Sequence, residues 1–215
     1  MMRFRRTSTA ECWIRIAMFA LVGLVLATVA IARDEEGQTP VEREQALLEQ
    51  LEEAPNDADL HYRLANALYD QGRREKAIAS YERALAVEPD HVKALVNLGV
   101  VLNENGDSEA ALKRFDRAEE LEPTDVTVLC NKGQALYALE RYGEAIDLYQ
   151  KAKKLEPNNQ LPYYLMGVAF ADVGIYREAI REWEKVVALD PSTEAAETAA
   201  ESIKVLRQLV PAGSE

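Results

Sequence analysis

The chain has 215 residues with 25 basic and 37 acidic side chains, so its formal net charge is −12. This balance argues against nucleic-acid binding, because phosphate contacts need clustered Lys and Arg, and the 48% hydrophobic content excludes wholesale disorder. Two cysteines are too few for a disulfide framework, and two histidines leave little material for a metal site or for His-based catalysis.

An uncharged, apolar run of 17 residues occupies positions 16–32. As a helix it would extend ~25 Å, the short end of a bilayer span. Basic side chains precede the run, and acidic ones follow it closely. The basic set is Arg3, Arg5, Arg6 and Arg15. Because cytoplasmic flanks carry the excess of positive charge, the leader 1–15 is expected in the cytoplasm and the rest of the chain outside it.

Two interpretations fit the run 16–32. It is either an uncleaved signal-anchor or a signal peptide that is removed after Ala32. Ala30 and Ala32 supply the small residues of a cleavage site, but the run is long for a signal peptide, which favours the anchor. A buried core helix fits the basic flank less well. We expect a single-pass bacterial inner-membrane protein facing the periplasm, or a periplasmic or secreted protein after cleavage.

The part of the chain after the run is strongly acidic. Residues 33–215 hold 21 basic and 36 acidic side chains, a net charge of −15. Anionic lipid headgroups would repel this surface, so residues 33–39 are expected to act as a polar tether. Within the segment 33–57, an apolar side on residues 41–53 predicts an N-terminal cap helix.

A period of 34 residues organises the remaining chain. Five of the eight prolines share this spacing: Pro55, Pro89, Pro123, Pro157 and Pro191. Each is followed by a residue able to cap a helix N-terminus: Asn56, Asp90, Thr124, Asn158 and Ser192. We therefore expect Pro to end one helix and the next residue to cap the following one.

Small and aromatic residues recur with the same period. The small columns read Ala65, Gly99, Gly133 and Gly167, then Ala77, Ala111, Ala145 and Ala179. Four residues further on stand Tyr81, Phe115, Tyr149 and Trp183. Small residues at fixed places let antiparallel helices approach closely, and the aromatic fills the space beside that contact.

This pattern resembles the tetratricopeptide repeat (TPR), a 34-residue helix-turn-helix unit. The resemblance covers residues 58–191 as four repeats, 58–91, 92–125, 126–159 and 160–191. It implies an all-α fold, a right-handed α-solenoid with flanking cap helices, here preceded by one N-terminal transmembrane or signal helix. Three departures from the repeat pattern predict looser packing. Lys132 stands where the other repeats have Leu64, Leu98 and Met166, and Val186 stands where they have Ala84, Ala118 and Ala152. Glu140 stands where the other inter-helix turns have Gly72, Gly106 and Gly174.

Each repeat is expected to hold two helices, A and B. The predicted A helices are 58–71, 92–105, 126–139 and 160–173. The predicted B helices are 74–87, 108–121, 142–155 and 176–189. Within the C-terminal segment 192–215, residues 193–209 predict a polar capping helix with one apolar stripe, which a solenoid end requires.

The resemblance implies that A helices line a concave groove that binds segments of other proteins. The candidate groove residues are Tyr62, Asn66, Tyr69, Asn97, Asn131, Gln134 and Tyr164. Side-chain amides can bond a partner's main chain, and Tyr offers a large contact area at low entropic cost.

Sites for other chemistry are hard to find. No phosphate loop, paired Cys or Ser-centred motif occurs, and no cationic cluster surrounds Cys130 to activate its thiol. We expect no catalytic residue, no metal and no cofactor. The sequence favours a non-catalytic scaffold that docks partner proteins and supports assembly of an envelope or membrane complex. The alternative is self-assembly of this chain into a homo-oligomeric coat or platform.

TPR domains that clamp acidic C-terminal peptides use Lys and Arg at set groove positions. Here those positions hold Tyr62, Thr127 and Asn131, so a carboxylate pair would meet no counter-charge. We predict no tight binding of an acidic C-terminal peptide. Calorimetric titration checks this, and micromolar affinity would contradict the prediction.

Overall fold

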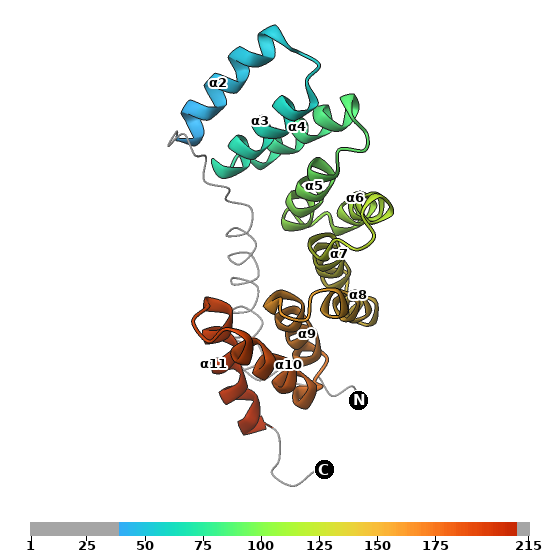
Figure 1. Cartoon of the computed structure of the whole chain (residues 1–215), viewed down its shortest axis with the longest axis vertical. Helices are drawn as coiled ribbons and strands as arrows, with labels where there is room; N and C mark the ends of the chain where they lie inside the picture. Colours follow the sequence, from blue (N-terminus) through green and yellow to red (C-terminus); the bar gives the residue numbers. More distant parts are fainter. Residues whose placement is uncertain (1–38, 210–215) are drawn as a thin grey trace, which may run out of the picture.

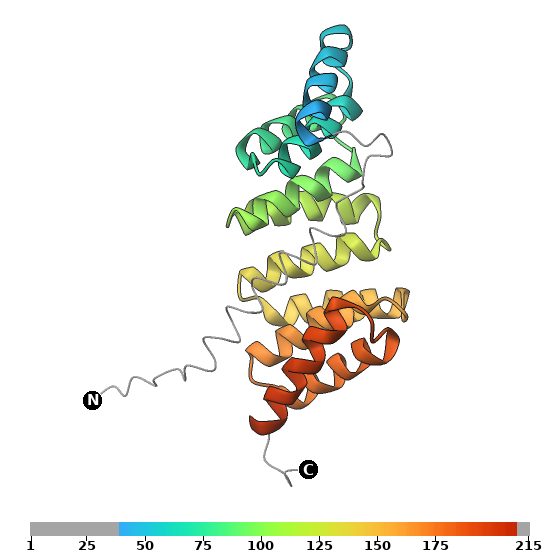
Figure 2. The ribbon, with the colours of Figure 1, turned by 90° about the vertical axis from the view of Figure 1, so that its left-hand side faces the viewer.

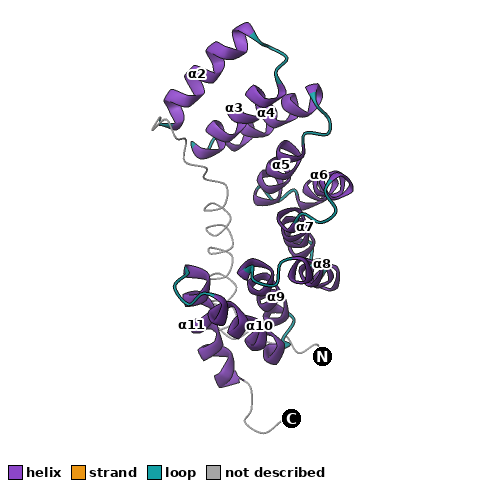
Figure 3. Cartoon of the chain, viewed as in Figure 1, coloured by secondary structure: helices purple, strands orange, loops and turns teal. Residues whose placement is uncertain are grey.

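The computed structural model describes residues 39–209, and every regular element within them is a helix (Figure 3). The A helices are α3 (Ala58–Asp70), α5 (Val92–Glu104), α7 (Val126–Ala138) and α9 (Gln160–Asp172). The B helices are α4 (Arg74–Val87), α6 (Ser108–Leu121), α8 (Tyr142–Leu155) and α10 (Tyr176–Leu189). The flanking helices are α2 (Pro40–Glu53) and α11 (Glu194–Leu209).

The helices stack into a curved solenoid with two layers. Figure 1 shows α3, α5, α7 and α9 along the inner, concave side, with α4, α6 and α8 behind them. The view at right angles shows the pairs piled one on the next (Figure 2). At the two ends, α2 packs on α3 and α11 packs on α10. The concave side is therefore built from A helices, as the resemblance to the tetratricopeptide repeat implied.

The predicted helix boundaries are confirmed almost everywhere. All four B helices have the predicted bounds, whereas each A helix ends one residue earlier than expected. The early end follows from the turn, because the second residue after each A helix has positive φ. These residues are Gly72, Gly106, Glu140 and Gly174.

The prediction for the helix N-caps was wrong by one residue. The capping side chain belongs to the second residue after Pro, so Asp57 accepts from the Leu60 N–H at 2.9 Å and Asp125 from the Val128 N–H at 3.0 Å. Asn159 also caps in this way. Pro and its neighbour instead form the turn, which the Asp57 N–H closes by donating to the Ala54 carbonyl.

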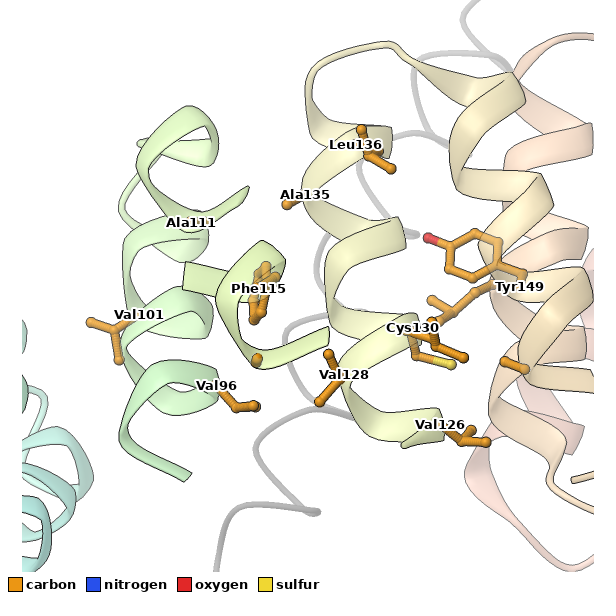
Figure 4. Packing of buried hydrophobic residues seen from close by; sticks show 14 of the residues in the cluster. Val96, Val101, Ala111, Phe115, Val126, Val128, Cys130, Ala135, Leu136 and Tyr149 are labelled. Atoms are coloured by element: carbon orange, nitrogen blue, oxygen red, sulfur yellow. The ribbon is translucent and has the colours of Figure 1, made fainter. Parts of the chain in front are cut away.

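The core is one continuous cluster along the solenoid, and its repeating unit is a glycine against an aromatic ring. A Cβ at Gly99 would lie 2.6 Å from the Phe115 ring, and one at Gly167 would lie 2.3 Å from Trp183. Figure 4 shows Phe115 and Tyr149 inserted among the neighbouring helices. The A and B helices approach so closely that the ring occupies the place of a side chain.

The looser packing expected at Lys132 and Val186 is not found. Lys132 reaches back to α6, where its ammonium lies 2.7 Å from Asp116 and 2.9 Å from Glu119. Val186 is fully buried, at 0% exposure. An ion pair between repeats thus replaces the apolar contact, and the valine is accommodated in the core.

Glu140 keeps the turn geometry of the glycines despite its side chain. Its φ is +60°, and the Arg141 N–H still donates to the Leu136 carbonyl at 2.9 Å, as the Arg73 N–H does to Leu68. A non-glycine residue in this conformation costs ~1 kcal/mol. The departure at this position therefore changes local strain and leaves the turn in place.

The predicted membrane-spanning run 16–32 lies outside the described residues. Among the helices of residues 39–209, none has the length and apolar character needed to cross a bilayer.

The glycine–ring contact gives a stability test. Gly133→Ala would place its Cβ 2.3 Å from Tyr149, whereas a Cβ at Gly143, in the first turn of α8, would meet nothing within 4 Å. Overpacking costs ~1–3 kcal/mol and exceeds the ~1 kcal/mol that Ala gains over Gly in a helix. We expect Gly133→Ala to lower, and Gly143→Ala to keep or raise, the free energy of unfolding in urea. Equal stabilities would contradict the close contact.

Candidate functional site

Three of the predicted groove residues come together where α3 meets α5. The Asn97 amide donates to the Asn66 side-chain oxygen at 3.0 Å and to the Tyr62 hydroxyl at 3.3 Å. The Tyr81 hydroxyl, reaching through from α4, donates to the same Asn66 oxygen at 2.5 Å. The first two repeats are therefore joined by a side-chain network on the concave layer, in which Asn66 is the shared acceptor.

Aromatic rings hold this network in place. The Tyr62 ring lies 5.0 Å from the His91 ring and 6.1 Å from the Tyr81 ring, measured between centroids. Burial raises the pKa of Tyr81 well above its usual range, so its hydroxyl stays protonated and donates. His91 is itself fixed, because its Nδ1 accepts the Ala94 N–H at 3.2 Å and caps α5.

Tyr69 lies apart from the network and bonds to an acid of the next repeat. Its hydroxyl donates to Glu104 at 2.9 Å, and burial together with that carboxylate raises the Tyr69 pKa above its usual range. Tyr137 donates to Asp172 in the same way two repeats later. Both pairs are 35 residues apart, a regularity that could have been read from the sequence but was missed.

Asn131 and Gln134 lie one turn apart on α7 and are almost fully buried, at 6% and 5% exposure. Within residues 39–209, neither end of the Gln134 amide has a hydrogen-bond partner. The equivalent residue of the first repeat, Asn66, bonds to Asn97, but the place of Asn97 is taken by Leu165 in the fourth repeat. The structure thus leaves a buried amide unsatisfied in the third repeat.

Tyr164 is buried at 2% exposure, and burial raises its pKa to about 12. Its carbonyl accepts the Trp183 indole N–H at 3.2 Å, which ties α9 to α10. The predicted groove residues therefore divide into a network of Tyr62, Asn66 and Asn97, a separately held Tyr69, and the buried set Asn131, Gln134 and Tyr164.

Cys130 lies on α7 with no exposed surface, and burial raises its thiol pKa to about 12. At neutral pH the thiol is therefore protonated and a poor nucleophile. In residues 39–209, no three His, Cys, Asp or Glu side chains are grouped closely enough to hold a metal ion.

Comparison with known proteins agrees with the repeat geometry. The chain matches family models described as tetratricopeptide repeat over residues 62–126 and 126–159. The Mus musculus protein O-mannosyl-transferase TMTC1 is 33% identical over 85 residues, which is 40% of this chain and 9% of that protein. The chain thus spans less than a tenth of this relative, too little to carry over its activity.

Solved structures share the solenoid. The MamA RS-1 ArsTM double mutant has a TM-score of 0.67 at 20% identity, covering 88% of this chain and 99% of that chain. YrrB, described as a TPR protein with an unusual peptide-binding site, has a TM-score of 0.62 at 23% identity, covering 77% and 84%. At these identities the likeness concerns the fold. Residues 62–159 therefore consist of repeats of the tetratricopeptide family, and the solved structures show the same solenoid fold.

Proposed function

We propose that this chain is a non-catalytic scaffold that docks segments of partner proteins on its concave face and supports assembly of an envelope or membrane complex. The observation that carries the proposal is the Tyr62–Asn66–Asn97 network on the concave layer. It presents a half-buried ring and fixed amides on the side formed by the A helices.

The network suits peptide docking because it is already ordered. The Tyr62 ring lies against the His91 ring at a tilt, and Asn97 is oriented by two acceptors. Binding therefore costs little side-chain entropy, and a ring with a polar end gives both contact area and a hydrogen bond. A few such anchors supply most of the affinity in protein interfaces.

Fold analogy adds modest support. YrrB has a peptide-binding site on a solenoid similar to this one. One fold serves many functions. The proposal therefore rests on the residues of this chain, and the similar structure shows only that such a solenoid can bind a peptide. A catalytic role for Cys130 is disfavoured by its buried, protonated thiol.

The proposal places the solenoid outside the cytoplasm, tethered by residues 16–32. The support is sequence-based: an uncharged run with basic residues before it and a strongly acidic chain after it. The tether would keep the docking face near a membrane without pressing the acidic solenoid against it.

A crosslinked pull-down from membranes tests the docking face. We expect the double variant Tyr62→Ala, Asn97→Ala to reduce capture of one specific partner by roughly tenfold or more, the effect of losing an anchor. Asn66 is left in place, since its removal would strand the buried Tyr81 hydroxyl.

The matched control is Arg83→Ala, Lys113→Ala, which changes exposed residues on the B helices of the same two repeats. Circular dichroism melts establish that both variants fold. If the Tyr62, Asn97 variant captures the same partners as the unchanged chain, the concave face is not the docking face. If both variants lose the partner equally, the docking face is not confined to the concave side.

Self-assembly remains the second candidate, favoured by exposed apolar residues at both ends of the solenoid. Val41 is 61% exposed on α2, and Leu209 is 46% exposed on α11. Charge repulsion opposes end-to-end stacking of two copies. Glu197 and Glu201 lie exposed on α11 and would face the acidic α2 of the next copy.

Light scattering of residues 40–215 distinguishes the two candidates. We expect a monomer at tens of micromolar, because burying these glutamates without partners is costly. A concentration-dependent increase in mass would favour the coat or platform instead.

A further inference from the structure

The chain has two histidines, and both lie beside the Tyr62–Asn66–Asn97 network. His61 directly precedes Tyr62 on α3. His91 caps the N-terminus of α5, and the centroid of its ring lies 5.0 Å from that of the Tyr62 ring. Histidine is the side chain that ordinarily becomes charged between about pH 8 and about pH 5. Histidine titration in mild acid is therefore confined to the part of the solenoid that carries the network.

His61 has one ring nitrogen bonded and the other buried without a partner. Its Nε2 lies 2.9 Å from the Pro55 carbonyl oxygen, so Nε2 carries the proton and donates the hydrogen bond. The residue is 8% exposed, and within residues 39–209 its Nδ1 has no hydrogen-bond partner. A second proton would enter at Nδ1 and place an uncompensated charge in the interior, which is costly. The folded first repeat therefore opposes protonation of His61.

His91 uses its Nδ1 as a hydrogen-bond acceptor. The Ala94 N–H donates to this nitrogen at 3.2 Å and is thereby satisfied at the N-terminus of α5. A proton on Nδ1 would turn the acceptor into a donor that faces another donor, so the bond would be lost. The new positive charge would also meet the positive end of the helix dipole. The cap of α5 therefore exists only while His91 is neutral.

The carboxylates next to the two rings are engaged by other groups. Asp57, in the turn beside His61, caps α3 by accepting a backbone N–H. Asp90, which precedes His91, accepts the Arg117 guanidinium at 2.6 Å. The other titratable side chains near the rings are Glu53 on α2, Tyr62 on α3, Tyr81 on α4 and Lys93 on α5. Glu53 and Lys93 are exposed, where water screens their charges, so within the described part of the chain no neighbour offsets a proton on either ring.

Other repeats fill both positions without histidine. At the position of His61 they hold Leu95, Leu129 and Tyr163. The Tyr163 hydroxyl donates to the Pro157 carbonyl at 3.0 Å, the equivalent of the His61 bond. At the position of His91 they hold Asp57, Asp125 and Asn159, and each of these side chains caps its helix. The turn at Pro55 and the cap of α5 are therefore the places at which the solenoid relies on a neutral imidazole.

We propose that mild acid opens the first repeat by protonating His61 and His91, while the later repeats stay folded. The unfolded chain takes up protons that the folded first repeat excludes, so this repeat loses stability as the pH falls and regains it as the pH rises. The Tyr62 ring then loses the His91 ring against which it lies, and the turn before α3 loses its tie to His61. The consequence for partners rests on the proposed function: a segment docked on the network is released in acid.

Hydrogen exchange of the full chain in detergent micelles tests this inference, with mass spectrometry of peptides from each repeat. Exchange is compared at about pH 7.5 and about pH 5.5, the range in which histidine becomes charged, after correction for the intrinsic exchange rate. We expect protection in α3 and at the start of α5 to fall at least about fivefold, the effect of losing one helix cap. Protection in α7 and α9, which contain no histidine, should change less than about twofold.

The matched control replaces both histidines with residues that other repeats use. His61→Tyr copies Tyr163, and His91→Asn copies the cap Asn159. We expect this double variant to keep equal protection in α3 and α5 at both pH values. Burial raises the pKa of Asp70 on α3, but Asp70 is present in both chains, so its titration produces no difference between them.

Three results would overturn the inference: no acid loss of protection in the unchanged chain, an equal loss in the double variant, or a uniform loss from α3 to α9. Circular dichroism at neutral pH checks the fold of the variant. Where His61→Tyr prevents folding, His61→Leu replaces it, because Leu95 and Leu129 fill the same position. The exchange experiment needs no partner, whereas the pull-down is done at neutral pH, so the opening and the docking can fail separately.

Discussion

The contact between a glycine on an A helix and an aromatic ring on its B helix is the constraint on which the solenoid depends. Gly99, Gly133 and Gly167 have no room for a Cβ, because a ring occupies that place. The ring fixes the distance between the two helices, and the period of 34 residues repeats that distance along the chain. The curvature, and with it the concave layer of A helices, follows from this one repeated spacing.

The first repeat has different residues at the contact between its A and B helices, and this difference creates the candidate site. Ala65 stands in the glycine column, and the opposing ring is Tyr81, whose hydroxyl passes through to Asn66. The buried core aromatic is thereby hydrogen-bonded to a side chain of the concave layer. In the second and fourth repeats the rings are Phe115 and Trp183, which have no hydroxyl, and Val100 and Val168 stand at the position of Asn66.

The regular parts of the fold could be predicted because they depend on residues whose backbone constraints are strong. Pro and Gly mark the turns, so the B helices had the predicted bounds. The N-caps were displaced by one residue because Pro55 and Asn56 both belong to the turn, which a pattern of residue types does not distinguish. The ion pairs of Lys132 were missed because its partners lie on another helix. For the site, the sequence indicated that the candidate residues lie on the A helices. It did not indicate that Asn66 is hydrogen-bonded whereas Gln134 is not. That difference depends on the residue at the equivalent position of the next repeat, which is Asn97 for Asn66 and Leu165 for Gln134.

The junctions between repeats also differ in kind. A tyrosine hydroxyl bonds an acid across the first junction, Tyr69 to Glu104, and across the third, Tyr137 to Asp172. The second junction has Lys132 and Lys151 around Glu119, and the third junction adds an ion pair of Lys153 with Glu182. Ions in solution screen such charge pairs far more than they weaken buried packing or a neutral hydroxyl donor. All three junctions share the buried packing, so raising the ionic strength weakens the charge pairs between repeats and leaves in place the packing that holds the arc.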